Sequence, residues 1–321
     1  MALKKIKNQT GNKPSLLTPN NDFPFSFGLY KFRFDGWLFV GLNLLVPLIA
    51  LFTIRFTLGF DKTGQLIYIG LNLFCFVLSM VYFLYKDSKL FMKSGLFIFY
   101  ALQIMNPLIM LTIGGLGLSL IKNDSPWRDV WTMGVQVATE IVIIIWAFRS
   151  TLDLKERVKN TFKNDLKKLL AIVAIGTIVI FGASFLYGLA TKGTVLGGDS
   201  DNQNSLIGKL REPGLGIGVK ITTLLLLAIF TIGVAPLAEE LAIRHAWYIG
   251  CGNRTIAWLT SALFFALIHV SSGDVEHLLN YFIAGFILST IFNLSKGNVT
   301  HSWLTHLSYN AIGYIAVVAS L

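Results

Sequence analysis

Long runs of apolar residues constrain the fold of this chain more than any other feature. Nine of them lie near residues 37–57, 65–85, 95–121, 129–148, 169–190, 219–249, 254–270, 277–294 and 298–319. A helix that crosses a bilayer needs about 20 mostly apolar residues. The sequence therefore predicts an all-α, polytopic transmembrane helical bundle of about eight or nine spans, in which the seventh and eighth helices are short.

The composition agrees with a membrane protein. Of the 321 residues, 54% are hydrophobic and only 14% are charged, whereas soluble domains carry roughly 25% charged residues. The net charge of +10 is then interpreted as an excess of lysine and arginine in the loops. We therefore expect a lipid bilayer around the chain and no nucleic acid as a partner. The two cysteines, Cys75 and Cys251, provide neither a disulfide framework nor a CxxC metal site.

Basic residues alternate between successive loops. Lysine and arginine gather in residues 1–36, between the second and third apolar segments, and between the fourth and fifth, while the intervening loops are only weakly basic. The positive-inside rule therefore predicts a cytoplasmic N-terminus. Residues 1–36 are expected to form a polar cytoplasmic tail and not a cleavable signal peptide, because no apolar run follows the first lysines directly.

The remaining chain divides at its longest polar stretch. Residues 37–190 are N-terminal transmembrane helices of unassigned role, residues 191–218 are expected to form a flexible exterior loop, and residues 219–321 form a motif-bearing helical core.

Residues 149–168 combine an apolar stripe with many lysines, which predicts an amphipathic helix at the membrane surface. Glu140 lies within an apolar segment and is expected to face the protein interior, whereas His245 is expected near the interface.

Three short motifs place ionisable side chains inside the apolar segments of the C-terminal half. Such residues are expensive in hydrocarbon, so each is a functional-site hypothesis. A lone FxxxH or HxxxN pattern is weak, but the three together, in three neighbouring segments, are much more specific. The motif residues are Glu239, Glu240 and Arg244, then Phe265 and His269, then His306 and Asn310.

Simple helix geometry allows the three motifs to meet. With a turn at Gly252, Glu240 lies about 18 Å before it and His269 about 25 Å after it, at 1.5 Å per residue. A second turn at Ser295–Asn298 brings His306 to a similar depth. Residues four apart share a helix face, which predicts a Glu240–Arg244 pair, while Glu239 is rotated by about 100° from Glu240.

These residue types suit hydrolysis of an acyl bond. A desolvated glutamate can act as a base near neutral pH, and a nearby histidine can help to activate a water. A second histidine and an asparagine are donors suited to an oxyanion. This chemistry requires no serine or cysteine nucleophile.

The order EExxxR, FxxxH and HxxxN/D resembles the CPBP family, also called Abi or CAAX prenyl endopeptidase-like proteins, over roughly residues 219–314. The resemblance implies an intramembrane protease in which Glu239 activates water, His269 assists, and His306 and Asn310 stabilise the oxyanion. It gives Glu240 and Arg244 a supporting role and places Phe265 beside His269. Two histidines and a glutamate could also bind a divalent metal, but we expect glutamate chemistry without a metal cofactor.

Several functions remain open at this point. The first is an endopeptidase that cleaves a peptide or membrane-protein substrate in a bacterial plasma membrane. For this function, the resemblance to the CPBP family implies a role in peptide maturation or bacteriocin self-immunity. The second is a non-catalytic immunity factor or a scaffold that regulates a membrane partner. The third is a transporter with a proton-linked Glu/His relay, which predicts inverted repeats that the sequence does not show.

Overall fold

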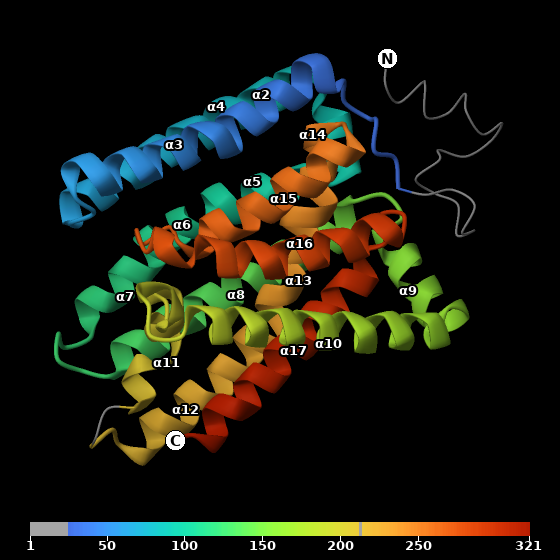
Figure 1. Ribbon diagram of the computed structural model, residues 1–321. Helices are drawn as coiled ribbons and strands as arrows, with labels where there is room; N and C mark the ends of the chain where they lie inside the picture. The colour runs from blue at the N-terminus through green and yellow to red at the C-terminus, as the bar shows by residue number, and fades with distance from the viewer. Residues whose placement is uncertain (1–24, 212–213) are drawn as a thin grey trace.

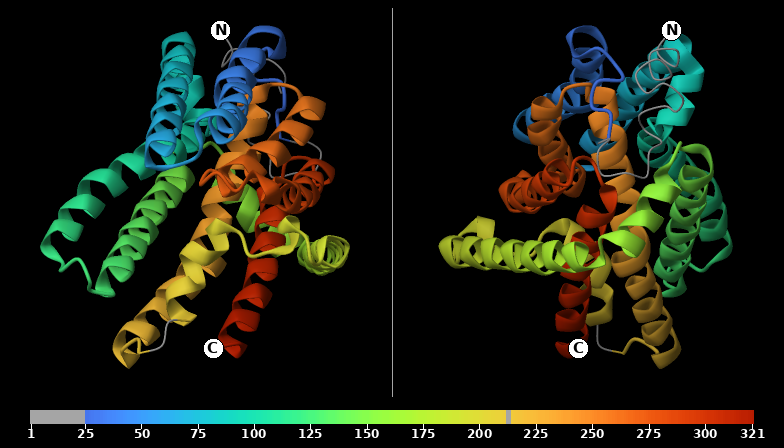
Figure 2. Two further views of the ribbon diagram at one scale, coloured as in Figure 1. Left: turned by 60° about the vertical axis from the view of Figure 1, so that its left-hand side comes forward. Right: turned by 90° about the vertical axis from the view of Figure 1, so that its right-hand side faces the viewer.

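The computed structural model describes residues 25–211 and 214–321, and all regular structure in these two ranges is helical (Figure 1). Residues 1–24 of the predicted tail lie outside the described residues. A first helical rod covers Phe32–Leu58 and includes α2 (Trp37–Val40) and α3 (Val46–Thr53). Together with α4 (Lys62–Ser94), it forms one edge of the molecule (Figures 1 and 2).

The next two rods form a helical hairpin. The rod Phe97–Leu120 contains α5 (Phe97–Tyr100), α6 (Asn106–Ile109) and α7 (Gly115–Leu120), and α8 (Trp127–Ser150) follows it. Arg128 holds the connecting turn, because its guanidinium donates to the carbonyls of Leu118 and Ile121 at 2.7 and 3.0 Å. Glu140 on α8 is buried, which confirms the prediction that it faces the interior.

Helix α10 (Leu166–Thr191) lies crosswise over α17 (Val299–Ala319), as Figure 1 and the right panel of Figure 2 show. Close approach at Gly176 permits this crossing. A Cβ at Gly176 would lie only 2.7 Å from Ile291 Cδ1 on α16 (Leu278–Leu294) and 2.8 Å from Thr305 Cγ2 on α17. A larger residue at this position would therefore push the three helices apart.

A long rod, Ile217–Cys251, runs through the motif-bearing half. It consists of α12 (Ile217–Ala228), α13 (Ala235–Glu239) and α14 (Trp247–Cys251), joined by π-helical turns over Ile229–Val234 and Glu240–Ala246. Gly252 ends the rod with a φ of 66°. The chain returns through α15 (Arg254–His269), which Asn253 caps by accepting the Ile256 N–H. The expected turn at Gly252 is confirmed.

The polytopic helical bundle predicted from the sequence is confirmed. Seven helical rods in the described part of the chain are long and apolar enough to cross a membrane, and the predicted short seventh element is α15, with 16 residues. The polar stretch 191–218 differs from the expected loop, because it contains α11 (Asp201–Ile207). Ser200 and Gln203 form a capping box that starts this helix, a signal that the glycine-rich composition concealed.

The amphipathic segment 149–168 contains α9 (Leu154–Asn164), whose lysines are exposed while a few other side chains pack on the protein. Leu154 is fully buried. Arg157 lies with its Nη2 3.3 Å from His245 Nδ1 and donates from Nη1 to the Gly297 carbonyl at 3.4 Å. His245 is therefore buried inside the protein, and our expectation of an interfacial position is wrong.

Candidate active site

Two adjacent glutamates at the end of α13 lie in different surroundings. The side chain of Glu240 is 0% exposed, whereas that of Glu239 is 19% exposed and lines a cavity. The rotation of about 100° between neighbouring helix positions explains the difference. Only Glu239 of the pair is therefore placed to contact a molecule in the cavity.

Arg244 is the buried partner of Glu240, as the spacing predicted. Its Nε lies 3.5 Å from Glu240 Oε2, one helical turn away. Its two terminal nitrogens donate to Ser261 Oγ at 3.0 Å and to the Gly285 carbonyl at 3.3 Å. The guanidinium therefore ties the long rod to α15 and α16, which makes it a structural centre of the site.

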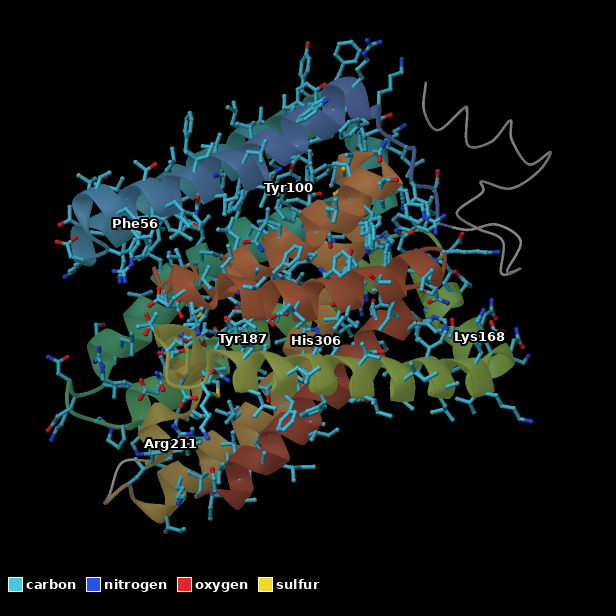
Figure 3. The ribbon with its side chains drawn as sticks, viewed as in Figure 1. Phe56, Tyr100, Lys168, Tyr187, Arg211 and His306 are labelled. Atoms are coloured by element: carbon cyan, nitrogen blue, oxygen red, sulfur yellow. The ribbon has the colours of Figure 1, made fainter. Side chains whose placement is uncertain are left out.

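His306, from α17, joins the third motif to the first. Its Nε2 lies 3.9 Å from Glu239 Oε2 and its Nδ1 lies 3.4 Å from Glu240 Oε1. The His306 side chain is 6% exposed, and Figure 3 labels it near the middle of the molecule (Figure 3). A single histidine thus contacts both carboxylates, a position that sequence spacing did not specify.

His269, at the end of α15, is held in one tautomer. Its Nδ1 lies 2.7 Å from the carbonyl oxygen of Phe265, and because a carbonyl only accepts, Nδ1 carries the hydrogen. The Nε2 of a neutral ring then keeps its lone pair. The ring contacts Phe265, as expected, with centroids 4.4 Å apart, and it stacks on Tyr281 at 4.6 Å with an interplanar angle of 27°.

Asn310 lies one turn after His306 on α17. Its Nδ2 donates to the carbonyl of Thr231, in the π-helical turn before α13, at 2.9 Å. This bond uses one of the two amide hydrogens, so the second one and the side-chain oxygen are left for other partners. Asn310 therefore both braces α17 against the long rod and lines the cavity.

A cavity of about 480 Å³ brings the motif residues together. Glu239, Phe265, His269, His306 and Asn310 all line it, whereas Glu240 and Arg244 lie behind this surface. Its volume falls within the roughly 300–1,000 Å³ of small-molecule sites. The convergence of the three motifs, which helix geometry allowed, is thus present in the structure.

Sequence reasoning missed several residues of the same cavity. Gln136 reaches it from α8 and Tyr281 from α16. Five further lining residues belong to the short helix α11. Neither Gln136 nor Tyr281 belongs to one of the three motifs, and α11 lies in the stretch 191–218 that the sequence predicts to be a loop. The capping box at Ser200 was the only local signal for the helix.

The donor set does not match a metal centre. Within residues 25–211 and 214–321, no three His, Cys, Asp or Glu side chains are arranged to hold a metal ion together. Glu240 already faces Arg244, which leaves Glu239 as the carboxylate of the pair that lines the cavity. Glutamate chemistry without a metal cofactor stays a prediction from the sequence.

The fold and the site define the class of this protein: a polytopic helical membrane protein with a Glu/His cluster at an internal cavity. A family model described as type II CAAX prenyl endopeptidase Rce1-like matches residues 221–312, which include all three motifs. The chain belongs to this CAAX protease-like family.

Two relatives extend the comparison. An uncharacterized protein of Mycoplasma capricolum subsp. capricolum is 31% identical over 316 residues, which cover 95% of this chain and 93% of that protein. The UPF0177 protein YxdF of Lactococcus lactis subsp. lactis is 26% identical over 163 residues, covering 50% of this chain and 83% of that protein. No solved structure matches the chain.

Proposed function

We propose that this protein is an intramembrane endopeptidase that hydrolyses a peptide bond with a water activated by Glu239 and His269. The observation that carries the proposal is the division between the two glutamates. Glu239 faces the cavity, while Glu240 is buried against Arg244. The family match supports the same reaction class. Residues 219–321 would then be the catalytic core.

In the proposed reaction, Glu239 takes a proton from water as the water oxygen attacks the carbonyl carbon of the scissile bond. His269 Nε2, left with a lone pair by the Nδ1–H bond to Phe265, accepts a second hydrogen bond from that water. The carbon–nitrogen bond then breaks, and the proton held by Glu239 passes to the leaving amine. Glu239 returns to its carboxylate form.

The negative charge on the carbonyl oxygen needs donors in the cavity. Asn310 has an amide hydrogen that is not used by Thr231, and His306 lines the same cavity with its Nε2 beside Glu239. This assigns His306 and Asn310 to oxyanion stabilisation.

The substrate is proposed to be a peptide or membrane protein, and the site of action a bacterial plasma membrane with the N-terminus in the cytoplasm. The relatives in Mycoplasma and Lactococcus support a bacterial setting. Peptide maturation and bacteriocin self-immunity are the two roles that this chemistry would serve. In the alternative, a non-catalytic immunity factor or scaffold, the cavity would bind a partner without cleaving it.

The test is cleavage of a quenched peptide library, including prenylated members, by purified wild type and Glu239→Ala in detergent. Activity in wild type that is lost in a folded Glu239→Ala protein supports the proposal. Equal activity in the two proteins contradicts it. A cellular phenotype that Glu239→Ala leaves unchanged would favour the scaffold.

A further inference from the structure

The strongest feature that the proposed function does not use is Tyr281, at the start of α16. Its ring stacks on the imidazole of His269, with centroids 4.6 Å apart. Its hydroxyl lies 2.6 Å from Ser200 Oγ and accepts from Asn202 Nδ2 at 3.4 Å. One side chain thus contacts a proposed catalytic residue at its ring and the start of α11 at its hydroxyl.

A second hydrogen bond fixes the N-terminus of α11, next to its contact with Tyr281. The N–H of Asp201 donates to Asp274 Oδ2 at 3.0 Å, and Asp274 is itself held by Ser272 Oγ at 2.8 Å. Asp274 belongs to the turn that follows His269, and it is 7% exposed. The N-terminus of α11 is therefore attached both to the turn after α15 and to α16.

Helix α11 also forms part of the cavity wall. Asn202, Gln203, Ser205, Leu206 and Ile207 all line the cavity that contains Glu239 and His269. A short helix packed there depends on its few anchoring bonds, because seven residues are too few to be stable as an isolated helix. The Ser200–Tyr281 contact is one of those anchors.

We propose that Tyr281 is a positioning residue: its ring fixes the orientation of His269, and its hydroxyl couples that orientation to the packing of α11 against the cavity. The catalytic consequence rests on the proposed function, but the two structural links do not. When α11 is packed, the Tyr281 ring is held over His269 and its Nε2 stays directed for water activation. When α11 detaches, this restraint on His269 is lost.

Two substitutions separate the two links. Tyr281→Phe keeps the ring and removes the hydroxyl, whereas Tyr281→Leu removes both. Tyr85→Phe is the matched control, because Tyr85 is 93% exposed. Folding of each variant is checked by thermal unfolding in detergent.

The first readout is the NMR spectrum of protein labelled with ¹³C and ¹⁵N in histidine, of which the chain has five. The resonance of His269 is assigned by its loss in His269→Gln. Stacked rings shift the imidazole protons upfield, so we expect a downfield move in Tyr281→Leu and none in Tyr85→Phe. An unchanged His269 resonance in a folded Tyr281→Leu protein would overturn the proposal.

The second readout is hydrogen exchange of the α11 amides followed by mass spectrometry. Loss of the hydroxyl in Tyr281→Phe removes the contacts to Ser200 and Asn202. It should speed exchange in α11 roughly 5- to 30-fold, the factor expected for one to two hydrogen bonds, and leave α9 unchanged. Equal exchange in wild type and Tyr281→Phe would contradict the coupling to α11.

Cleavage kinetics then link the position of His269 to the reaction. We expect kcat to fall about 100-fold in Tyr281→Leu, the scale of a misplaced catalytic group, and much less in Tyr281→Phe. If wild type cleaves no peptide, the proposed function fails on its own, and the NMR and exchange results still decide the role of Tyr281.

Discussion

At the residue scale, the most informative pair is Glu239 and Glu240. The two residues are adjacent in sequence and identical in chemistry, but they differ in burial. One helix step turns the side chain of Glu240 into the protein and that of Glu239 toward the cavity. A carboxylate buried beside a guanidinium serves stability first, because removing one partner leaves the other charge uncompensated. The two residues should therefore respond to substitution in different ways.

We expect Glu240→Gln to lower the free energy of unfolding by about 3 kcal/mol, because it leaves Arg244 without its carboxylate. Glu239→Gln should change the same quantity far less, since its side chain lies at the cavity. Thermal unfolding of both variants in one detergent measures the difference. A Glu240→Gln protein as stable as wild type would show that the ion pair is not a structural centre.

Much of the site at this scale could be predicted from the sequence. The Glu240–Arg244 and Phe265–His269 contacts follow from a spacing of four residues, which helix geometry turns directly into proximity. The contact of His306 with both glutamates could not be predicted, because it depends on how α17 packs against the long rod. Tyr281 belongs to none of the three motifs, so only the fold reveals its stacking on His269.

At the element scale, α10 depends on a glycine. Gly176 and Gly182 lie on the same helix, but only Gly176 faces α16 and α17 closely, whereas nothing lies within 4 Å of a Cβ at Gly182. Close contact between helices through small residues is a common device in membranes. The pair therefore provides a comparison in which helix propensity is the same and packing differs.

We expect Gly176→Val to destabilise the protein by about 1–3 kcal/mol through overpacking against Ile291 and Thr305. Gly182→Val should have little effect, since its new side chain meets open space. Thermal unfolding in detergent again measures the change. Equal melting temperatures for the two variants would mean that α10 does not cross the other helices as described.

Helix α9 is attached to the core by Arg157. Burial lowers the pKa of this guanidinium to about 10, so it remains charged at neutral pH. Its contacts with His245 and the Gly297 carbonyl join α9 to the long rod and to the turn before α17. The amphipathic pattern predicted a helix here, but a pattern of exposed lysines could not reveal that one arginine among them is half-buried and contacts His245.

Arg157→Met should release α9, and we expect its amides to exchange hydrogen at least about 100-fold faster, because two hydrogen bonds from a charged group are lost. Lys159→Met is the matched control, because Lys159 is exposed on the same helix. Exchange that is equally slow in both variants would show that Arg157 does not attach α9.

At the scale of the whole molecule, composition and apolar run length were sufficient for the fold class, since the bilayer imposes both. They could not show that α10 crosses α17 or that α11 closes one wall of the cavity, because these depend on packing between distant segments (Figures 1 and 2). The division of the chain at residues 191–218 is likewise a sequence-based expectation, and the helix within that stretch contributes to the C-terminal site.

The orientation predicted from basic residues can be tested on intact cells. We expect Lys155→Cys to be protected from a membrane-impermeant thiol reagent, because the lysine-rich segment should face the cytoplasm. Asp124→Cys, in the turn before α8, should react. Both positions are exposed, and the native Cys75 and Cys251 are buried, so the parent protein provides the background. The reverse labelling pattern would invert the topology.

The central claim is that water attacks the peptide bond directly, activated by Glu239, and a single turnover in H₂¹⁸O tests it most directly. Mass spectrometry of the product and of the intact protein follows one cleaved peptide through the reaction. The account predicts ¹⁸O in the new carboxylate, a protein mass that never changes, and no product with Glu239→Gln. A protein adduct with the mass of the N-terminal fragment, or full turnover by Glu239→Gln, would contradict it.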